Sequence, residues 1–377
     1  MQLSVIILNY NVRYFLELCV LSVQKALLTI DAEIIVIDNN SQDDSCEMMK
    51  LRFPNVRLIE NKENSGFPKG NNIGVAVAQG EYICILNPDT VVAEDTFEKV
   101  LAFAKKQNNL GIIGCKLIDG TGNFLPESKR GVPTPFVAFT KITGVYKVFP
   151  KTFGKYYAQQ LSENESGKVD ILVGAFMCMK RELYTDIGGF DEDCFMYSDD
   201  IDLSYMALKS GKSNYYFHET SVVHFKGEST IKDGTYMKRF QEAMNFFYKK
   251  HFKVSYFFSV FMKIGIVFFS FVKMFEGKPK SKSSADNYIV FSDNEFVIEK
   301  LNKVVRKPIK RQEDLKQFSN NELTEIVFDQ HFMDFKTIIK TLEAEKNKGF
   351  TFKIYLQESG FMIGSNSSFD RGEIIKI

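Results

Sequence analysis

The first 120 residues alternate short apolar runs rich in β-branched residues with longer amphipathic stretches. Continuous apolar runs bounded by polar residues predict buried strands, and apolar residues with a period near 3.6 predict helices. This alternation predicts an α/β fold with a mostly parallel sheet and helices on both faces. The expected elements are strands 3–8, 33–37, 56–60, 82–86 and 110–116, and helices 12–28, 43–53 and 94–106.

A loop rich in Pro and Gly, residues 126–150, interrupts the alternation. Apolar runs then predict strands at 169–179 and 213–217, and an acidic segment after Ser198 predicts the start of a helix between them. A helix is expected at 236–250. Beyond it, strands at 287–292, 323–328 and 351–356 and helices at 294–305 and 332–348 predict a small α/β unit.

We therefore expect about two domains in this chain of 377 residues. The net charge of +1 gives no bulk electrostatic field of the kind that nucleic-acid binders carry, and no nucleic-acid partner is expected.

The six cysteines form no C-x-x-C pair and mostly lie in apolar runs, which favours reduced, buried thiols. The N-terminus enters an apolar run without a basic leader, so we expect no signal peptide and a cytoplasmic protein.

Residues 256–275 form a run rich in Phe that is about long enough to span a bilayer. Lys263 falls near its middle, which is costly in a membrane span, and flanking lysines suit lipid headgroups. A helix lying in the membrane interface fits best, with a helix packed on protein and a true span as alternatives. We expect a domain at 1–235, amphipathic helices at 236–276 and a basic linker at 277–286. A small α/β unit is expected at 287–377, and the sequence does not indicate its role.

Polar residues follow three of the expected strands at the point where each strand ends. They are Asn9-Tyr10-Asn11, the segment 38–41 (DNNS) and Asn87-Pro88-Asp89. Because ligands of such sheets bind at the carboxyl ends of the strands, these side chains are expected to share one crevice. Neither a P-loop nor a glycine-rich dinucleotide turn occurs, which argues against ATP hydrolysis and hydride transfer.

Two acidic sets carry chemistry in this pattern. Asn87 and Asp89 offer hard oxygen ligands for Mg²⁺ or Mn²⁺, although the same residues also suit a plain turn. Asp199, Asp200 and Asp202 open a helix, where the helix dipole keeps carboxylates ionised and able to act as a general base. Simple N-capping is the alternative for this set.

At this point the sequence resembles the family-2 glycosyltransferases with a GT-A fold, and within them the rhamnosyltransferase-like branch. Seven motifs occur in order over residues 1 to 250. They are 5–11 (VIILNYN), 36–41 (VIDNNS), 64–72 (NSGFPKGNN), 86–90 (LNPDT), 174–177 (GAFM), 188–192 (GGFDE) and 197–203 (YSDDIDL).

The resemblance implies a Rossmann-like mixed sheet and a role for each matching residue. Asp38 and Asn40 match contacts to the base and ribose of the donor nucleotide, and Tyr10 matches an aromatic that stacks on the base; Asn9 adjoins it. Asn87 and Asp89 match the metal motif, with Asn87 in place of its first carboxylate. The remaining implied roles are Asp200 as general base, Asp199 as its neighbour that orients acceptor or base, and His224 as a further metal or diphosphate ligand. Lys69, in an expected loop at 66–70 (GFPKG), is a candidate donor contact, with a solvated lysine as the alternative.

The resemblance also implies the reaction. A sugar would pass from a UDP- or dTDP-sugar, with rhamnose as the best single guess, to a hydroxyl of a glycan or lipid-linked acceptor, with inversion and with the protein at the inner membrane face. A non-catalytic subunit that binds sugar nucleotides or assists membrane assembly is the alternative, although a degenerate binder would be expected to lose Asp89 or Asp200. A nucleotidyltransferase is disfavoured because the first loop lacks the basic, glycine-rich sequence that holds a triphosphate.

Overall fold

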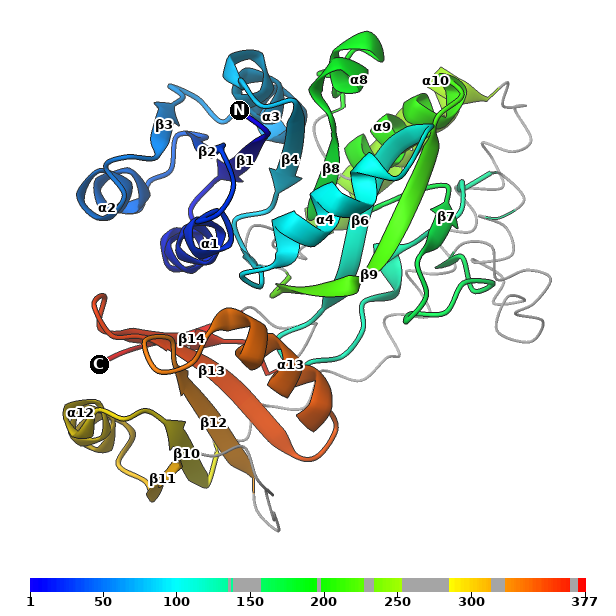
Figure 1. The fold of residues 1–377 in the computed structure, drawn as a ribbon. Helices are drawn as coiled ribbons and strands as arrows, with labels where there is room; N and C mark the ends of the chain where they lie inside the picture. Colours follow the sequence, from blue (N-terminus) through cyan, green and yellow to red (C-terminus); the bar gives the residue numbers. More distant parts are fainter. Residues whose placement is uncertain are drawn as a thin grey trace.

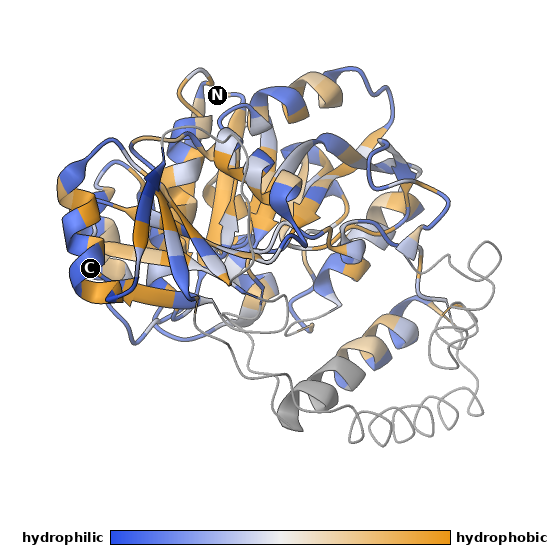
Figure 2. Ribbon diagram, turned by 90° about the horizontal axis from the view of Figure 1, so that it is seen from below, coloured by the Kyte–Doolittle hydropathy of each residue, from blue (hydrophilic) through white to orange (hydrophobic). Residues whose placement is uncertain are grey.

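The computed structural model describes residues 1–134, 137, 157–194, 198–226, 234–252, 285–312, 323–366 and 372–377. Over these residues the chain forms two sheets with helices packed on them (Figure 1). Hydrophobic residues concentrate in the strands, and hydrophilic residues cover the outer sides of many helices (Figure 2). The α/β class expected from the sequence is confirmed.

The first sheet has nine strands in the order β3-β2-β1-β4-β8-β6-β9-β5, with β7 beside β9. Strands β3, β2, β1 and β4 run parallel, whereas β8 runs antiparallel to both β4 and β6. The sheet is therefore mixed. The strands are β1 (Leu3–Asn9), β2 (Ala32–Asp38), β3 (Arg57–Glu60), β4 (Tyr82–Leu86), β5 (Thr90–Val91), β6 (Leu110–Ile118), β7 (Gly167–Val169), β8 (Phe176–Lys180) and β9 (Ser213–His224).

Helices cover both faces of this sheet, so central strands such as β1 and β4 are buried along their whole length. In β1, Val5 and Ile7 pack with α1, α2 and α4, and Ile6 and Leu8 pack with α3 and α9 on the other face. The helices are α1 (Arg13–Ala26), α2 (Ser45–Arg52), α3 (Gly66–Val77), α4 (Thr96–Lys105), α8 (Arg181–Asp186), α9 (Asp199–Lys209) and α10 (Gly234–His251), with a 3₁₀ turn at Pro126–Ser128.

Three details differ from the expected elements. The segment 66–77 is helix α3 rather than a loop, because Pro68 lies in the first turn, where a missing N–H costs no hydrogen bond. The run 169–179 is not one strand: β7 ends at Val169 and β8 begins at Phe176. Strand β9 continues past residue 217 through a bulge to His224, which places that histidine in the ladder.

The second sheet has six strands in the order β11-β10-β12-β13-β14-β15. The first four are parallel, and β14 and β15 are antiparallel additions. Its elements are β10 (Asn287–Phe291), α12 (Glu295–Val305), β11 (Ile309–Gln312), β12 (Thr324–Asp329), α13 (Phe335–Glu345), β13 (Phe350–Leu356), β14 (Phe361–Gly364) and β15 (Glu373–Lys376).

One hydrophobic core joins the two sheets. Phe335, Ile339 and neighbours on α13 and the second sheet pack in a single buried cluster with Phe15 of α1 and Val223 of β9. In Figure 1, α13 lies on the side of the second sheet that faces the first. The second sheet and its helix α13 therefore pack against α1 and β9 of the first sheet.

Polar contacts cross the same boundary. Glu94 accepts hydrogen bonds from the backbone N–H groups of Phe335 and Lys336, both at 2.8 Å, and thereby caps the first turn of α13. Asp334 caps the next free N–H, that of Thr337, at 2.6 Å. Lys25 of α1 donates to the Gln330 side chain at 2.9 Å.

Within the described residues no helix has both the length and the apolar character needed to cross a bilayer. The Phe-rich run 256–275 and most of the linker 277–286 lie outside those residues, so the expected interfacial helix stays a prediction. The expected domain limits stay predictions too; α10 starts at Gly234 and ends at His251, across the limit expected at 235.

All six cysteines are free thiols, and five of them are buried. Burial raises the pKa of Cys178 to about 12, so its thiol is protonated and unreactive at neutral pH. This agrees with the structural role expected for the cysteines.

We predict that Glu94→Gln lowers the free energy of unfolding by about 1–2 kcal/mol, because glutamine offers one acceptor oxygen to two N–H groups and removes a charge that favours the helix N-terminus. Glu299→Gln on the exposed side of α12 is the matched control and is expected to change stability by less than about 0.5 kcal/mol. Urea unfolding of both variants measures the difference. Equal losses would contradict a specific role for the Glu94 cap.

Candidate active site

The ends of β1 and β2 form the first part of the site. Asn9 and Asp38 are register partners in the parallel ladder, and Nδ2 of Asn9 donates to Oδ1 of Asp38 at 2.7 Å. The other oxygen of Asp38 accepts the backbone N–H of Ser41 at 2.8 Å. Both side chains are buried, so this carboxylate is fixed at the carboxyl edge of the sheet.

Two tight turns follow these strand ends. Asn11 and Asn40 adopt φ values of 56° and 63°, a region that asparagine tolerates better than most residues. The turns are tied together, since Asn11 Oδ1 accepts the N–H of Gln42 at 2.6 Å. Tyr10 is 38% exposed and is therefore accessible to a ligand at this edge. Lys69 lies on the exposed side of α3, not in the expected loop.

Asn87, Asp89 and His224 gather at the end of β4. Nε2 of His224 lies 3.4 Å from Oδ1 of Asp89 and 3.4 Å from Nδ2 of Asn87. The β5–β9 ladder creates this cluster, because Thr90 pairs with His224 across two antiparallel strands. Asp89 and His224 are 3% and 7% exposed.

The donor atoms of this cluster suit a divalent cation. Oδ1 of Asn87 and Oδ1 of Asp89 are buried without a hydrogen-bond partner in the described part of the chain. Two ligand atoms on one cation, each at about 2.1 Å and at right angles, lie about 3 Å apart, which is close to the 3.4 Å between Oδ1 of Asp89 and Nε2 of His224. No group of three or more His, Cys, Asp or Glu that could hold a metal occurs among the described residues, so the cluster would be completed by the ligand.

Two residues that the sequence analysis did not single out support this cluster. Cys19 of α1 donates its thiol to the carbonyl oxygen of Asn87 at 3.5 Å, and burial raises its pKa to about 12, so the thiol stays a donor. Glu127 pairs with Lys226, two residues after His224. Burial is the largest single influence and would raise the pKa of Glu127, but the charge and hydrogen bond of Lys226, together with smaller contributions, outweigh burial and lower that pKa.

Asp200 lies in the first turn of α9 and is held by two donors. Nη2 of Arg130 donates to its Oδ2 at 2.6 Å, and the backbone N–H of Gly174 donates to the same oxygen at 3.1 Å. Arg130 also donates to the carbonyl of Leu172 at 2.9 Å. Asp199 is buried beside it at the helix start. Residues 195–197 lie outside the described residues.

The Asn87 cluster and Asp200 are joined by two consecutive residues. The N–H of Asn87 donates to the carbonyl oxygen of Ala175 at 3.1 Å, and the preceding residue, Gly174, donates to Asp200. An added Cβ on Gly174 would lie 3.5 Å from Cβ of Asp200 and 3.6 Å from the ring of Phe67 on α3. The two acidic sets predicted from the sequence are thus neighbours.

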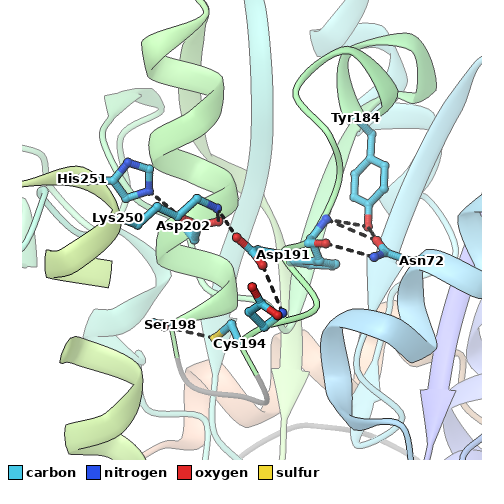
Figure 3. A network of polar contacts seen from close by, with 10 residues as sticks. Asn72, Tyr184, Asp191, Cys194, Ser198, Asp202, Lys250 and His251 are labelled. Atoms are coloured by element: carbon cyan, nitrogen blue, oxygen red, sulfur yellow. Dashed lines mark hydrogen bonds and ion pairs between the residues drawn. The ribbon is translucent and has the colours of Figure 1, made fainter. Parts of the chain in front are cut away.

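Asp202, the third member of the acidic motif, has a different role. It accepts from Lys250 at 2.8 Å and from Nε2 of His251 at 2.5 Å, which fastens the last turn of α10 to α9 (Figure 3). Lys250 also contacts Asp191 at 2.6 Å. Burial would lower the pKa of Lys250, but hydrogen bonds to these two carboxylates outweigh it and raise that pKa.

A sheet whose strand ends carry polar side chains and buried carboxylates is typical of a ligand-binding α/β domain. Residues 4–188 match the family model described as glycosyl transferase family 2. This part of the chain belongs to that family, and the resemblance found in the sequence is confirmed.

The individual relatives are distant. The chain is 25% identical over 214 residues to the N-acetylglucosaminyl-diphospho-decaprenol L-rhamnosyltransferase of Mycobacterium tuberculosis, covering 53% of this chain and 68% of the relative. It is 29% identical over 171 residues to the poly(ribitol-phosphate) beta-glucosyltransferase of Bacillus spizizenii, covering 44% of this chain and 26% of that protein. A mannosyltransferase structure from Pyrobaculum calidifontis, with GDP-Man and Mn²⁺, superposes with a TM-score of 0.46 at 20% identity, over 64% of this chain and 61% of that one.

The lowered pKa of Glu127 generates a prediction about pH. Its folded-state pKa lies below the unfolded value of about 4.3, so its stabilising effect is present above that value and is lost as the pH falls through the folded pKa. We expect wild type to be more stable than Glu127→Gln at pH 7 and the difference to shrink below about pH 4. Urea unfolding at stepped pH measures it, and a difference that grows on acidification would contradict the assignment.

Proposed function

We propose that this protein is an inverting glycosyltransferase that moves a sugar from a nucleotide diphosphate to an acceptor hydroxyl. The observation that carries the proposal is the hydrogen-bonded link from Asn87 through Ala175 and Gly174 to Asp200. It sets a carboxylate that can accept a proton beside a cluster that can face a diphosphate. The family of residues 4–188 supports the same class of reaction.

The donor nucleotide would lie along the ends of β1 and β2. Asp38, Asn9 and Asn40 would contact its base and ribose. Tyr10 would stack on the base. Lys69, exposed on α3, would reach the phosphates or the base from the other side of the crevice. UDP- and dTDP-sugars are the proposed donors.

The chemical step is a single displacement. The acceptor oxygen bonds to the anomeric carbon while the bond from that carbon to the diphosphate oxygen breaks and leaves its electron pair on the diphosphate. Asp200 takes the acceptor proton, and Asp199 beside it orients the acceptor or the base. Because attack and departure occur on opposite faces of the sugar, the configuration inverts.

Asp89, Asn87 and His224 would hold Mg²⁺ or Mn²⁺. Such a cation supplies positive charge for the departing diphosphate. The protein's own part is to present one carboxylate, one amide oxygen and one imidazole at the end of β4, where their burial excludes water.

The acceptor is proposed to be a glycan or a lipid-linked intermediate at the inner membrane face. The relative from M. tuberculosis is named for a decaprenol-linked acceptor and for rhamnose, and rhamnose is the first donor sugar to test here. The Phe-rich run 256–275 with its lysines would contact the membrane surface.

Transfer from a panel of labelled UDP-, dTDP- and GDP-sugars to lipid-linked and polysaccharide acceptors, with and without Mn²⁺, tests the function. We expect Asp200→Asn to lower turnover by about 10²–10⁴-fold, because the acceptor keeps its proton, while donor binding is retained. Asp186→Asn on the exposed side of α8 is the matched control and should retain activity. Equal turnover of wild type and Asp200→Asn would favour a non-catalytic binding subunit.

Metal binding is predicted separately. Asp89→Asn and His224→Ala should each weaken Mn²⁺ binding to the full chain with bound nucleoside diphosphate by at least about tenfold, since the first removes the negative charge of a ligand and the second removes a ligand atom. His218→Ala, on the same strand but hydrogen-bonded to Ser166, is the control. Electron paramagnetic resonance of free Mn²⁺ gives the affinities, and unchanged affinity in both site variants would overturn the assignment.

A further inference from the structure

Arg130 is held in place by both its backbone and its side chain. Its N–H and C=O each pair with Ile171 at 2.9 Å. Its Nη2 then donates to the carbonyl of Leu172 and to Asp200. The guanidinium is thus fixed on the segment 171–174, which also supplies the Gly174 N–H to the same carboxylate.

The two carboxylate oxygens of Asp200 differ in their hydrogen-bond partners. Both hydrogen bonds that reach this side chain from the described residues go to Oδ2. The side chain as a whole is 12% exposed, and no described residue donates a hydrogen bond to Oδ1. A carboxylate held through one oxygen by two donors on a rigid segment has little freedom to rotate, so the direction of its other oxygen is set.

We propose that Arg130 is a positioning residue for the general base: it fixes Asp200 through Oδ2 and thereby aims Oδ1 at the acceptor hydroxyl. The inference rests on the proposed function. One nitrogen, Nη2, makes both the Leu172 and the Asp200 contact. A lysine would keep the positive charge, but its ammonium lies one bond closer to the backbone on a flexible stem and so would not hold the position of Nη2. Arg130 therefore matters for geometry as well as for charge.

A purely structural ion pair is the competing explanation. Counted as whole residues, backbone included, Arg130 and Asp200 are 9% and 8% exposed, and a buried pair of this kind affects folding whether or not it serves catalysis. The two explanations differ in what happens when Asp200 has already been changed. A positioning residue loses its effect on turnover, whereas a residue that only supports the fold keeps it.

The test is a cycle of four full-length proteins: wild type, Arg130→Lys, Asp200→Asn and the double variant. Arg181→Lys, whose guanidinium contacts the Gly80 carbonyl away from the site, is the matched control. We expect Arg130→Lys to lower kcat about 10–100-fold with the donor KM changed less than about twofold, and to have no further effect in the Asp200→Asn protein. Arg181→Lys should keep wild-type kcat.

Arg130→Ala with added guanidinium provides a second measurement if the lysine variant folds poorly. Recovery of kcat with guanidinium, at unchanged melting temperature, supports positioning, and no recovery in a folded protein overturns it. A kcat for Arg130→Lys equal to that of Arg181→Lys, or an equal further loss in the Asp200→Asn protein, also overturns it. A wild type that transfers no sugar from any donor overturns the proposed function itself, and that result is visible without any variant.

Discussion

The antiparallel pairing of β8 with β4 is the constraint on which the site depends. Parallel strands alone would bring Asn9, Asp38 and Asn87 to one edge, because their ends are in register. Strand β8 runs the opposite way, so the residues that precede it meet the end of β4. Gly174 lies in that segment and donates to Asp200, and this is why Asp200 is linked to the end of β4 although it lies far from Asp89 in the sequence.

The second sheet packs against the two strands, β5 and β9, that position Asp89 and His224. Val91 and Val223 flank Asp89 and His224 on the β5–β9 ladder, and both are buried in the core that includes α13. At the carboxyl ends of β10 and β12, Ser292 donates to Asp329 at 2.7 Å. The described part of this unit thus contacts the strands that carry Asp89 and His224 through a shared core.

Much of the fold could be predicted from local pattern. The alternation of buried strands and amphipathic helices is a local property, and it placed β1, α1, β2 and β4 within a residue or two of their observed ends. Helix α3 was missed because Gly66, Pro68 and Gly70 are typical of a loop; in the structure Gly70 lies so close to Leu8 that an added Cβ would be 2.4 Å from its side chain, a tertiary contact that leaves no local signal.

The candidate site was predictable to the extent that its residues end strands or open helices. Arg130 and Cys19 were not found, because neither lies in a motif and each acts through a partner distant in the sequence. An arginine in a loop rich in Pro and Gly resembles any solvated cation until the structure pairs it. Long-range partners of this kind leave no periodic signal.

The core shared by the two sheets limits how the protein can be divided. A fragment that ended after α10 would leave Phe15, Val223 and Phe225 without their covering side chains. Apolar side chains exposed together in this way form a hydrophobic patch that favours aggregation. Truncated forms of this chain would therefore be expected to aggregate, and a loss of activity in them would not identify catalytic residues.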